Sequence, residues 1–180
     1  MLIAGTGADL GAGETREAFV SQGNPALLRT PAEVKSYYLI NFARFVEWPS
    51  SAFLAPESPL HIGILGRDVL GSALQAYEGQ TIKGHRIKIV RSRDLRDLTG
   101  CQVLYLSESE EDDLIQLFRT LKSKPILTFG ETEGFLMYGG MVRFSTEEGK
   151  IKIRVNRRAT ETAQLKVSSR LLAITTIVEP

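Results

Sequence analysis

The strongest constraint on the fold is the regular alternation of short apolar runs with segments that carry a helical pattern. The apolar runs occupy residues 60–66, 86–90, 102–106 and 125–129. The helical patterns between them cover residues 68–77, 92–98 and 109–121. Apolar strands that alternate with helices are typical of a mostly parallel sheet with both faces covered. The sequence therefore predicts an α/β fold, with a mostly parallel open sheet and helices on both faces.

The last third of the chain follows a different pattern. Residues 141–145 and 151–155 alternate apolar and polar side chains around a Glu-Glu-Gly turn, which predicts an antiparallel hairpin at one edge of the sheet. A helical segment is expected over residues 156–172. A length of 180 residues supports one good core but is short for two, so we expect a single domain.

An amphipathic helix opens this domain. Residues 30–33 combine a capping box with a proline in the first turn, and the apolar side chains of residues 34–48 share one wide face. Pro49 ends the predicted helix. Asn41 falls inside the apolar face, where a buried amide requires hydrogen-bond partners. It therefore either ties the helix to a neighbouring backbone or marks a site, and we favour the tie.

The N-terminal segment differs in composition from the rest. Residues 1–29 are rich in glycine and alanine and lack periodicity, so we expect a flexible leader before a domain at residues 30–180. The leader has neither the basic start nor the roughly 7–15 apolar residues of a secretory signal. As written it predicts no signal peptide, although the small residues Gly11 and Ala12 fit the end of one whose start is missing.

Charge balance and cysteine usage exclude several classes of function. Lys and Arg number 22 against 21 Asp and Glu, so the chain lacks the basic character of nucleic-acid binding domains. The single cysteine, Cys101, excludes an intramolecular disulfide and a zinc site built from cysteine pairs. With only His61 and His85, a histidine-rich metal site is not expected either, and neither metal nor cofactor is predicted. Cys101 lies beside an apolar run, which predicts a small buried hydrophobic residue.

Catalytic motifs are not visible in the sequence. It contains neither a G-x-S-x-G nor an H-E-x-x-H motif, and His61 and His85 have no placed partner. We therefore predict no catalytic residue and no enzymatic activity.

The best-placed residues for binding a small molecule follow two predicted strands. These residues are Gly66, Arg67 and Asp68 after the first strand and Ser107 after the third. Open α/β sheets bind their ligands outside the carboxyl ends of the strands. The sequence thus predicts a ligand-binding edge there without specifying the ligand.

Six sequence blocks, in this order, resemble the YfiR/HmsC family, which also carries a domain-of-unknown-function label. The first, at residues 34–49, reads VKSYYLINFARFVEWP and is the most specific. The others are IGILG at 62–66, GCQVLYLS at 100–107, PILT at 125–128, GGMVRF at 139–144 and SSRLL at 168–172. The resemblance covers residues 32–178.

The resemblance implies an exported, periplasmic, non-enzymatic regulator of a Gram-negative bacterium. Such proteins bind the periplasmic sensing region of a membrane-anchored diguanylate cyclase and repress it, and release raises cyclic di-GMP and promotes biofilm formation. It further implies a homodimer and an outer-membrane lipoprotein that can sequester the regulator. We expect Phe42, Phe45 and Trp48 to pack, and Glu47, Trp48 and Pro49 with the following loop to contact the partner.

Characterised members of the family use cysteine pairs, whereas Cys101 is alone, so disulfide control here requires pairing between chains. Two other functions stay open. One is a small-molecule sensor that uses the ligand-binding edge and feeds a membrane signalling partner. The other is an enzyme on an α/β scaffold, weakened by the missing nucleophile and base.

Overall fold

The computed structural model describes residue 28 and residues 30–178. Apart from Leu28, the predicted leader at residues 1–29 lies outside the described residues. In the described part, no helix is both long enough and apolar enough to cross a bilayer.

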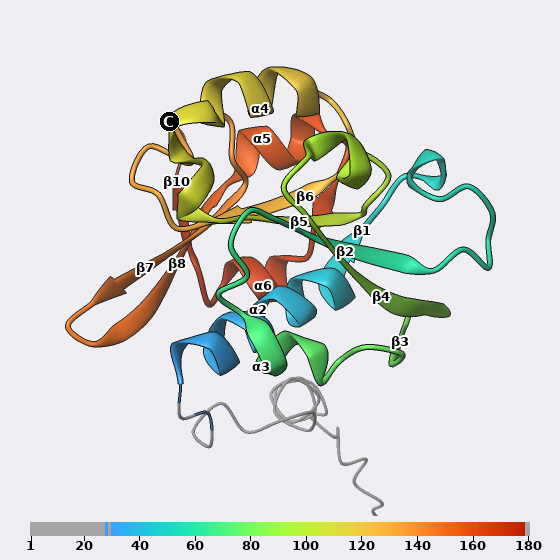
Figure 1. Ribbon diagram of the computed structural model, residues 1–180, viewed down its shortest axis with the longest axis horizontal. Helices are drawn as coiled ribbons and strands as arrows, with labels where there is room; N and C mark the ends of the chain where they lie inside the picture. The colour runs from blue at the N-terminus through green and yellow to red at the C-terminus, as the bar shows by residue number, and fades with distance from the viewer. Residues whose placement is uncertain (1–27, 29, 179–180) are drawn as a thin grey trace, which may run out of the picture.

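An eight-stranded sheet forms the centre of the described structure, in the order β10-β8-β7-β6-β5-β2-β4-β3 (Figure 1). Its strands are β2 (Leu60–Leu65), β3 (Thr81–Ile82), β4 (His85–Ser92), β5 (Val103–Leu106), β6 (Leu127–Gly130), β7 (Val142–Glu147), β8 (Lys150–Asn156) and β10 (Thr176–Val178). All neighbours from β4 to β7 are parallel, and β10 is parallel to β8. The predicted single α/β domain with a mostly parallel sheet is confirmed.

The hairpin predicted for the sheet edge is present but lies one strand inward. Strands β7 and β8 pair antiparallel from Val142–Val155 to Glu147–Lys150. Beyond them β10 pairs with β8, because the chain returns after its last helix and adds a strand there. The second antiparallel pair, β3 with β4, forms the opposite edge.

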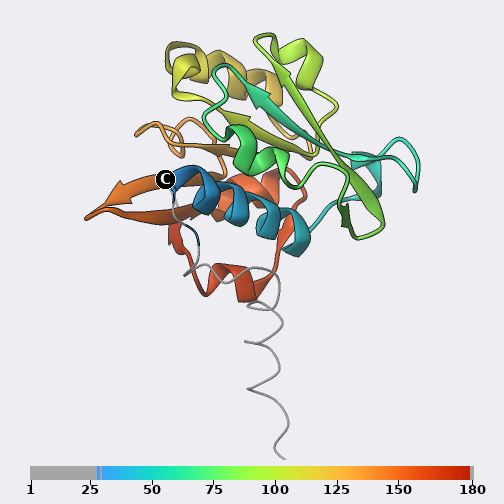
Figure 2. The ribbon, with the colours of Figure 1, turned by 60° about the horizontal axis from the view of Figure 1, so that its bottom comes forward.

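Helices cover both faces of the sheet (Figures 1 and 2). On one face lie α2 (Pro31–Phe45), α3 (Gly71–Gln75) and α6 (Ser169–Leu172), and on the other α4 (Leu114–Leu121). The remaining helical elements are α5 (Arg157–Thr162) and the 3-10 turns η2 (Ser50–Ala52), η3 (Leu95–Leu98) and η4 (Glu108–Asp113). Buried side chains accordingly form two clusters, one including α2 and one including α4.

The first helix begins as predicted and ends early. Thr30 Oγ1 accepts from Glu33 N at 3.2 Å and Glu33 Oε2 accepts from Thr30 N at 2.9 Å, which is the predicted capping box. The helix ends at Phe45, three residues before Trp48. Its continuation is β1 (Val46–Glu47), which pairs with β9 (Lys166–Val167) in a separate two-stranded sheet. A contact between segments about 120 residues apart thus overrides the local helical pattern.

Three other predicted helices are shorter or divided. The helix predicted for residues 156–172 consists of α5, β9 and α6, and Asn156 and Ser168 each cap one of the two helices. The helix predicted after Asp68 is only the five residues of α3. The segment 109–121 begins as the 3-10 turn η4 and becomes α-helical at Leu114.

Two predictions about single buried residues have opposite outcomes. Cys101 is 5% exposed, as predicted, and burial raises the pKa of its thiol to about 11. Asn41 is also 5% exposed, but its Nδ2 atom has no hydrogen-bond partner among the described residues. The expected tie from Asn41 to a neighbouring backbone is therefore wrong.

Candidate functional site

The structure brings the four residues of the predicted ligand-binding edge together. Gly66, Arg67 and Asp68 leave β2, and Ser107 leaves the adjacent parallel strand β5. Ser107 N donates to Leu65 O at 3.0 Å, which joins the ends of the two strands. Gly66 has φ +85°, and a Cβ on it would lie 2.4 Å from Ser109 Oγ. The turn after β2 therefore requires glycine, both for its backbone conformation and for the close approach of the neighbouring loop.

A hollow of about 350 Å³ opens at this edge and is lined in part by Arg67 and Ser107. The sequence did not indicate the other lining residues, among them Lys35, Tyr105 and Glu131. Glu131 directly follows β6, so the rule about carboxyl ends of strands applies to it as well. No sequence signal indicates Lys35, because α2 reaches this edge only through tertiary packing.

Lys35, Glu131 and Tyr105 form a connected polar group in this hollow. Lys35 Nζ lies 2.6 Å from Glu131 Oε2, and the two side chains are only 12% and 18% exposed. The Tyr105 hydroxyl donates a short hydrogen bond to Glu131 Oε1. Burial, and secondly the bond to Glu131, raise the pKa of Tyr105, so the phenol stays neutral. The group contains one cation, one carboxylate and one neutral hydroxyl, so its net charge is zero.

Asp68 supports the turn itself. Its Oδ1 accepts from Leu70 N at 2.9 Å and Gly71 N at 2.8 Å, and its Oδ2 accepts from Arg91 Nε at 2.7 Å. Partial burial opposes its ionisation, but these hydrogen bonds outweigh that effect and the pKa of Asp68 lies below its usual value. Asp68 does not line the hollow of Arg67 and Ser107, whereas the exposed Arg67 side chain does. Of the predicted ligand residues, Arg67 and Ser107 are thus the best placed to bind a small molecule.

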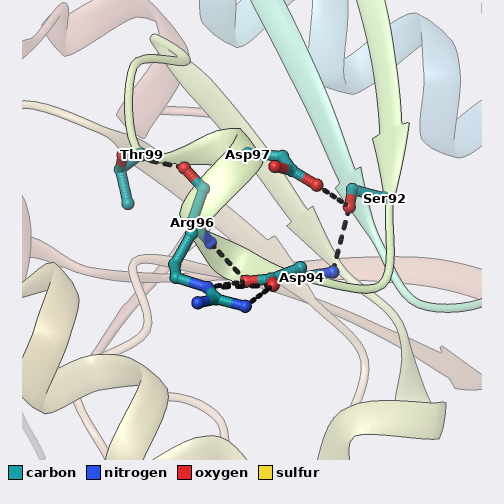
Figure 3. Close-up of polar contacts among 5 residues, drawn as sticks. All are labelled: Ser92, Asp94, Arg96, Asp97 and Thr99. Carbon is teal, nitrogen blue, oxygen red and sulfur yellow. Dashed lines mark hydrogen bonds and ion pairs between the residues drawn. The ribbon is translucent and has the colours of Figure 1, made fainter.

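The loop after β4 closes on itself (Figure 3). Ser92 Oγ donates to Asp97 Oδ2 at 2.7 Å and accepts from Asp94 N at 2.9 Å. Arg96 Nε donates to Asp94 Oδ2 at 2.9 Å, and the hydrogen bonds from the Arg96 side chain and backbone lower the pKa of Asp94 to about 2. The carboxylates of Asp94 and Asp97 thus accept hydrogen bonds from within the same turn, and these bonds hold η3 in place.

Neither histidine lines the hollow of Arg67 and Ser107. His61 and His85 line separate hollows elsewhere. Within the described part of the chain, no group of three or more His, Cys, Asp or Glu side chains is placed to hold a metal ion. The arrangement at the edge is suited to binding a small polar molecule through a cation and hydroxyl groups.

The predicted partner-binding residues Glu47, Trp48 and Pro49 line a second hollow, of about 290 Å³. Trp48 and Pro49 begin the segment of residues 48–59, which we call the WP loop. This loop extends from the sheet and is drawn in cyan in Figure 1. Glu47 is exposed, whereas Trp48 is half-buried and packs against the core, as predicted for the aromatic face.

The WP loop is held by several tertiary contacts. The Phe53 ring stacks on His85 with centroids 3.9 Å apart and contacts Trp48 edge-on at 6.4 Å. His85 Nδ1 lies 2.6 Å from Ser58 O, and because a carbonyl oxygen only accepts, this nitrogen carries the proton. Gln102 Nε2 donates to Ala52 O at 2.7 Å. These contacts fix the loop conformation against the sheet.

At the tip of this anchored loop, Leu54 is 104% exposed. Its neighbour Phe53 points into the contacts just described, so Leu54 is presented to solvent by a fixed backbone. Its exposure was not predictable, since it depends on the pairing of Phe53 with His85, 32 positions away in the chain.

Comparison with known families identifies the chain. The profile of YfiR/HmsC-like proteins matches residues 32–176, most of its length. The chain belongs to the YfiR/HmsC-like family. The match begins in the first turn of α2 and ends at the first residue of β10, so it includes both the ligand-binding edge and the WP loop.

Comparison with individual proteins adds support for the fold. No curated protein matches this YfiR/HmsC-like chain. A crystal structure of a conserved domain protein from Vibrio cholerae superimposes with a TM-score of 0.53 at 12% sequence identity. The superposition covers 82% of this chain and 60% of the other, so this chain spans less than two thirds of that protein. At this identity the likeness concerns the fold alone.

Proposed function

We propose that this YfiR/HmsC-like protein is a non-enzymatic periplasmic regulator that binds and represses the periplasmic sensing region of a membrane-anchored diguanylate cyclase. Repression would lower cyclic di-GMP and restrain biofilm formation. The family assignment supports the regulatory role. Release by an outer-membrane lipoprotein and homodimer formation belong to the same proposal.

The observation that carries partner binding is the WP loop. A loop that is already fixed by Phe53, His85 and Gln102 loses little conformational freedom on binding. Burial of a fully exposed leucine such as Leu54 contributes roughly 1.5–3 kcal/mol to association. Glu47 and Pro49 line a hollow that Phe53 of the same loop also lines, and we include them in the partner surface.

Leu54→Asp is expected to weaken the complex with the periplasmic region of a diguanylate cyclase encoded beside this protein at least about tenfold. In the complex, a carboxylate would take the place of an apolar side chain that the partner buries. The fold should be unchanged, since Leu54 makes no buried contact. The measurement is co-migration in size-exclusion chromatography, followed by titration calorimetry. Met137→Asp is the matched control, because Met137 is 78% exposed on a different loop.

The outcomes separate the surface from the function. If wild-type protein does not co-migrate with any adjacent membrane sensor, the proposed function is wrong. Complex formation that survives Leu54→Asp but not Met137→Asp would place the partner on another surface.

A small-molecule sensor is the second candidate function, favoured by the hollow that contains Arg67 and Ser107. A screen of periplasmic metabolites by thermal shift should then find a compound that raises the Tm through binding linkage. Arg67→Ala should abolish this rise without lowering the Tm of the free protein, because Arg67 is exposed. A flat screen would leave protein binding as the sole function.

A further inference from the structure

The hollow between α4 and α5 is independent of both surfaces described above. It has a volume of about 400 Å³ and a floor of buried apolar side chains. We call it the α4–α5 groove. Phe118, Leu121, Ile126 and Met141 contribute to its lining and are between 3% and 8% exposed.

Apolar side chains also stand at the mouth of this groove. Ile115 of α4 is 51% exposed, and Tyr138 from the loop before β7 is 47% exposed. The Tyr138 ring folds over Gly134, where an added Cβ would lie 2.5 Å from it. Tyr138 is thus held against the loop backbone at one side of the mouth, and Ile115 stands on α4.

The charged residues that line the groove are all cationic. They are Arg119 of α4, Lys122 at the C-cap of that helix and Arg158 of α5, and none of the described Asp or Glu residues lines the groove. The ion pairs found among the described residues involve none of the three cations. By contrast, the adjacent Arg157 pairs with Glu161 at 2.8 Å. The groove thus combines an apolar floor with positive charge that an anion would balance.

The polar side chains in the floor are already engaged. Asn156 Nδ2 donates to Leu136 O at 3.0 Å, and its Oδ1 accepts from Ala159 N at 2.9 Å. Thr128 Oγ1 accepts from Met141 N at 3.1 Å. The floor itself therefore offers few free polar groups to a ligand, whereas an apolar chain needs none there. The volume is in the range of small-molecule sites, which span about 300–1,000 Å³.

We propose that the α4–α5 groove binds a single-chain amphiphilic carboxylate of the medium-chain fatty acid class. The acyl chain lies over Phe118, Leu121 and Met141, and the carboxylate lies among Arg119, Lys122 and Arg158. Binding here is separate from the WP loop and from the hollow of Arg67, so the proposal stands or falls independently of the proposed function.

The test is titration calorimetry of the full chain with decanoate at low ionic strength and below its micellar concentration. We expect saturable binding at one site. Acetate, which carries only the charge, should not bind, and decyltrimethylammonium, which carries the opposite charge, should bind at least about tenfold more weakly than decanoate.

Two variants locate the site. Arg119→Gln combined with Lys122→Gln should weaken decanoate binding about tenfold or more, while the control Lys166→Gln with Arg170→Gln should not, because neither control residue lines the groove. Thr162→Trp places a large ring at an exposed position of the groove wall and should abolish binding with little effect on the Tm.

Three results would overturn the proposal. They are the absence of saturable decanoate binding, equal affinity for decyltrimethylammonium, and binding that persists in Thr162→Trp. If an acidic amphipathic helical peptide binds saturably and decanoate does not, the groove belongs to a protein partner and the fatty-acid assignment is wrong.

Discussion

Phe135→Ala is expected to lower the free energy of unfolding by about 3–5 kcal/mol, the usual cost of removing a fully buried aromatic ring. Phe135 is 0% exposed although it lies in the loop between β6 and β7. Its ring packs edge-on against Phe118 with centroids 5.2 Å apart. Chemical denaturation measures the change, and Met137→Ala in the same loop, 78% exposed, should stay within about 0.5 kcal/mol of wild type.

Two glycines make room for this ring, and they provide a sharper test. An added Cβ at Gly130 would lie 2.3 Å from the Phe135 ring, and one at Gly140 would lie 2.2 Å from it. Gly130→Ala and Gly140→Ala are therefore each expected to cost about 1–3 kcal/mol through overpacking. The Gly140 Cβ would also lie 2.6 Å from Phe135 O, a backbone atom that no side-chain substitution removes.

This difference predicts unequal rescue. Phe135→Leu should recover part of the stability lost in Gly130→Ala, since the three atoms nearest to that Cβ all belong to the Phe135 ring. It should recover less in Gly140→Ala, where the backbone oxygen remains. Additive costs in both pairs would contradict the packing described here, because residues in contact are expected to couple.

The loop that Phe135 anchors shows what sequence reasoning could and could not predict. Strands β2, β5 and β6 were predicted to within two residues, because their apolar runs are local and fully buried. Short elements such as β1 and β9 were not, since each exists only through pairing with the other. Local patterns therefore indicate the central strands, whereas the small sheet depends on tertiary contacts.

The candidate sites follow the same division. Gly66, Arg67 and Ser107 were predictable because topology alone places the carboxyl ends of parallel strands at one edge. Lys35 and Leu54 were not, because their positions depend on how α2 and the WP loop pack. Pro49, predicted to end the first helix, instead precedes the 3-10 turn η2, because the helix has already ended at Phe45.

Glu131→Ala is expected to lower the free energy of unfolding by about 1–3 kcal/mol. The variant leaves Lys35, 12% exposed, without its ion pair, and leaves the buried Tyr105 hydroxyl without its acceptor. The partial exposure of the pair places the cost below that of a fully buried one. Glu131→Gln should cost less, because its amide oxygen can still accept from Tyr105.

A double-mutant cycle isolates the ion pair. Lys35→Met keeps the apolar stem of the side chain and removes the charge, and it is combined with Glu131→Gln. We expect a coupling energy of about 0.5–3 kcal/mol between Lys35 and Glu131. Single costs that simply add would show that the 2.6 Å contact contributes no net stability.

Alkaline pH tests the third member of the group. Because burial raises the pKa of Tyr105 in the folded state, its contribution to stability is complete below the unfolded pKa of about 10 and is lost as pH rises above it.

Cys101, whose pKa is raised to about 11, shifts stability in the same direction, so Cys101→Ala serves as the background. In that background, Tyr105→Phe should reduce the fall in stability above pH 10, measured by urea titration, without removing it, because burial also raises the pKa of Tyr38 and of Tyr77. Glu131→Gln should leave most of the fall in place, since burial is the larger cause of the shift and the hydrogen bond to Glu131 the smaller. A fall that disappears in Glu131→Gln would instead make the carboxylate the main reason that Tyr105 stays neutral.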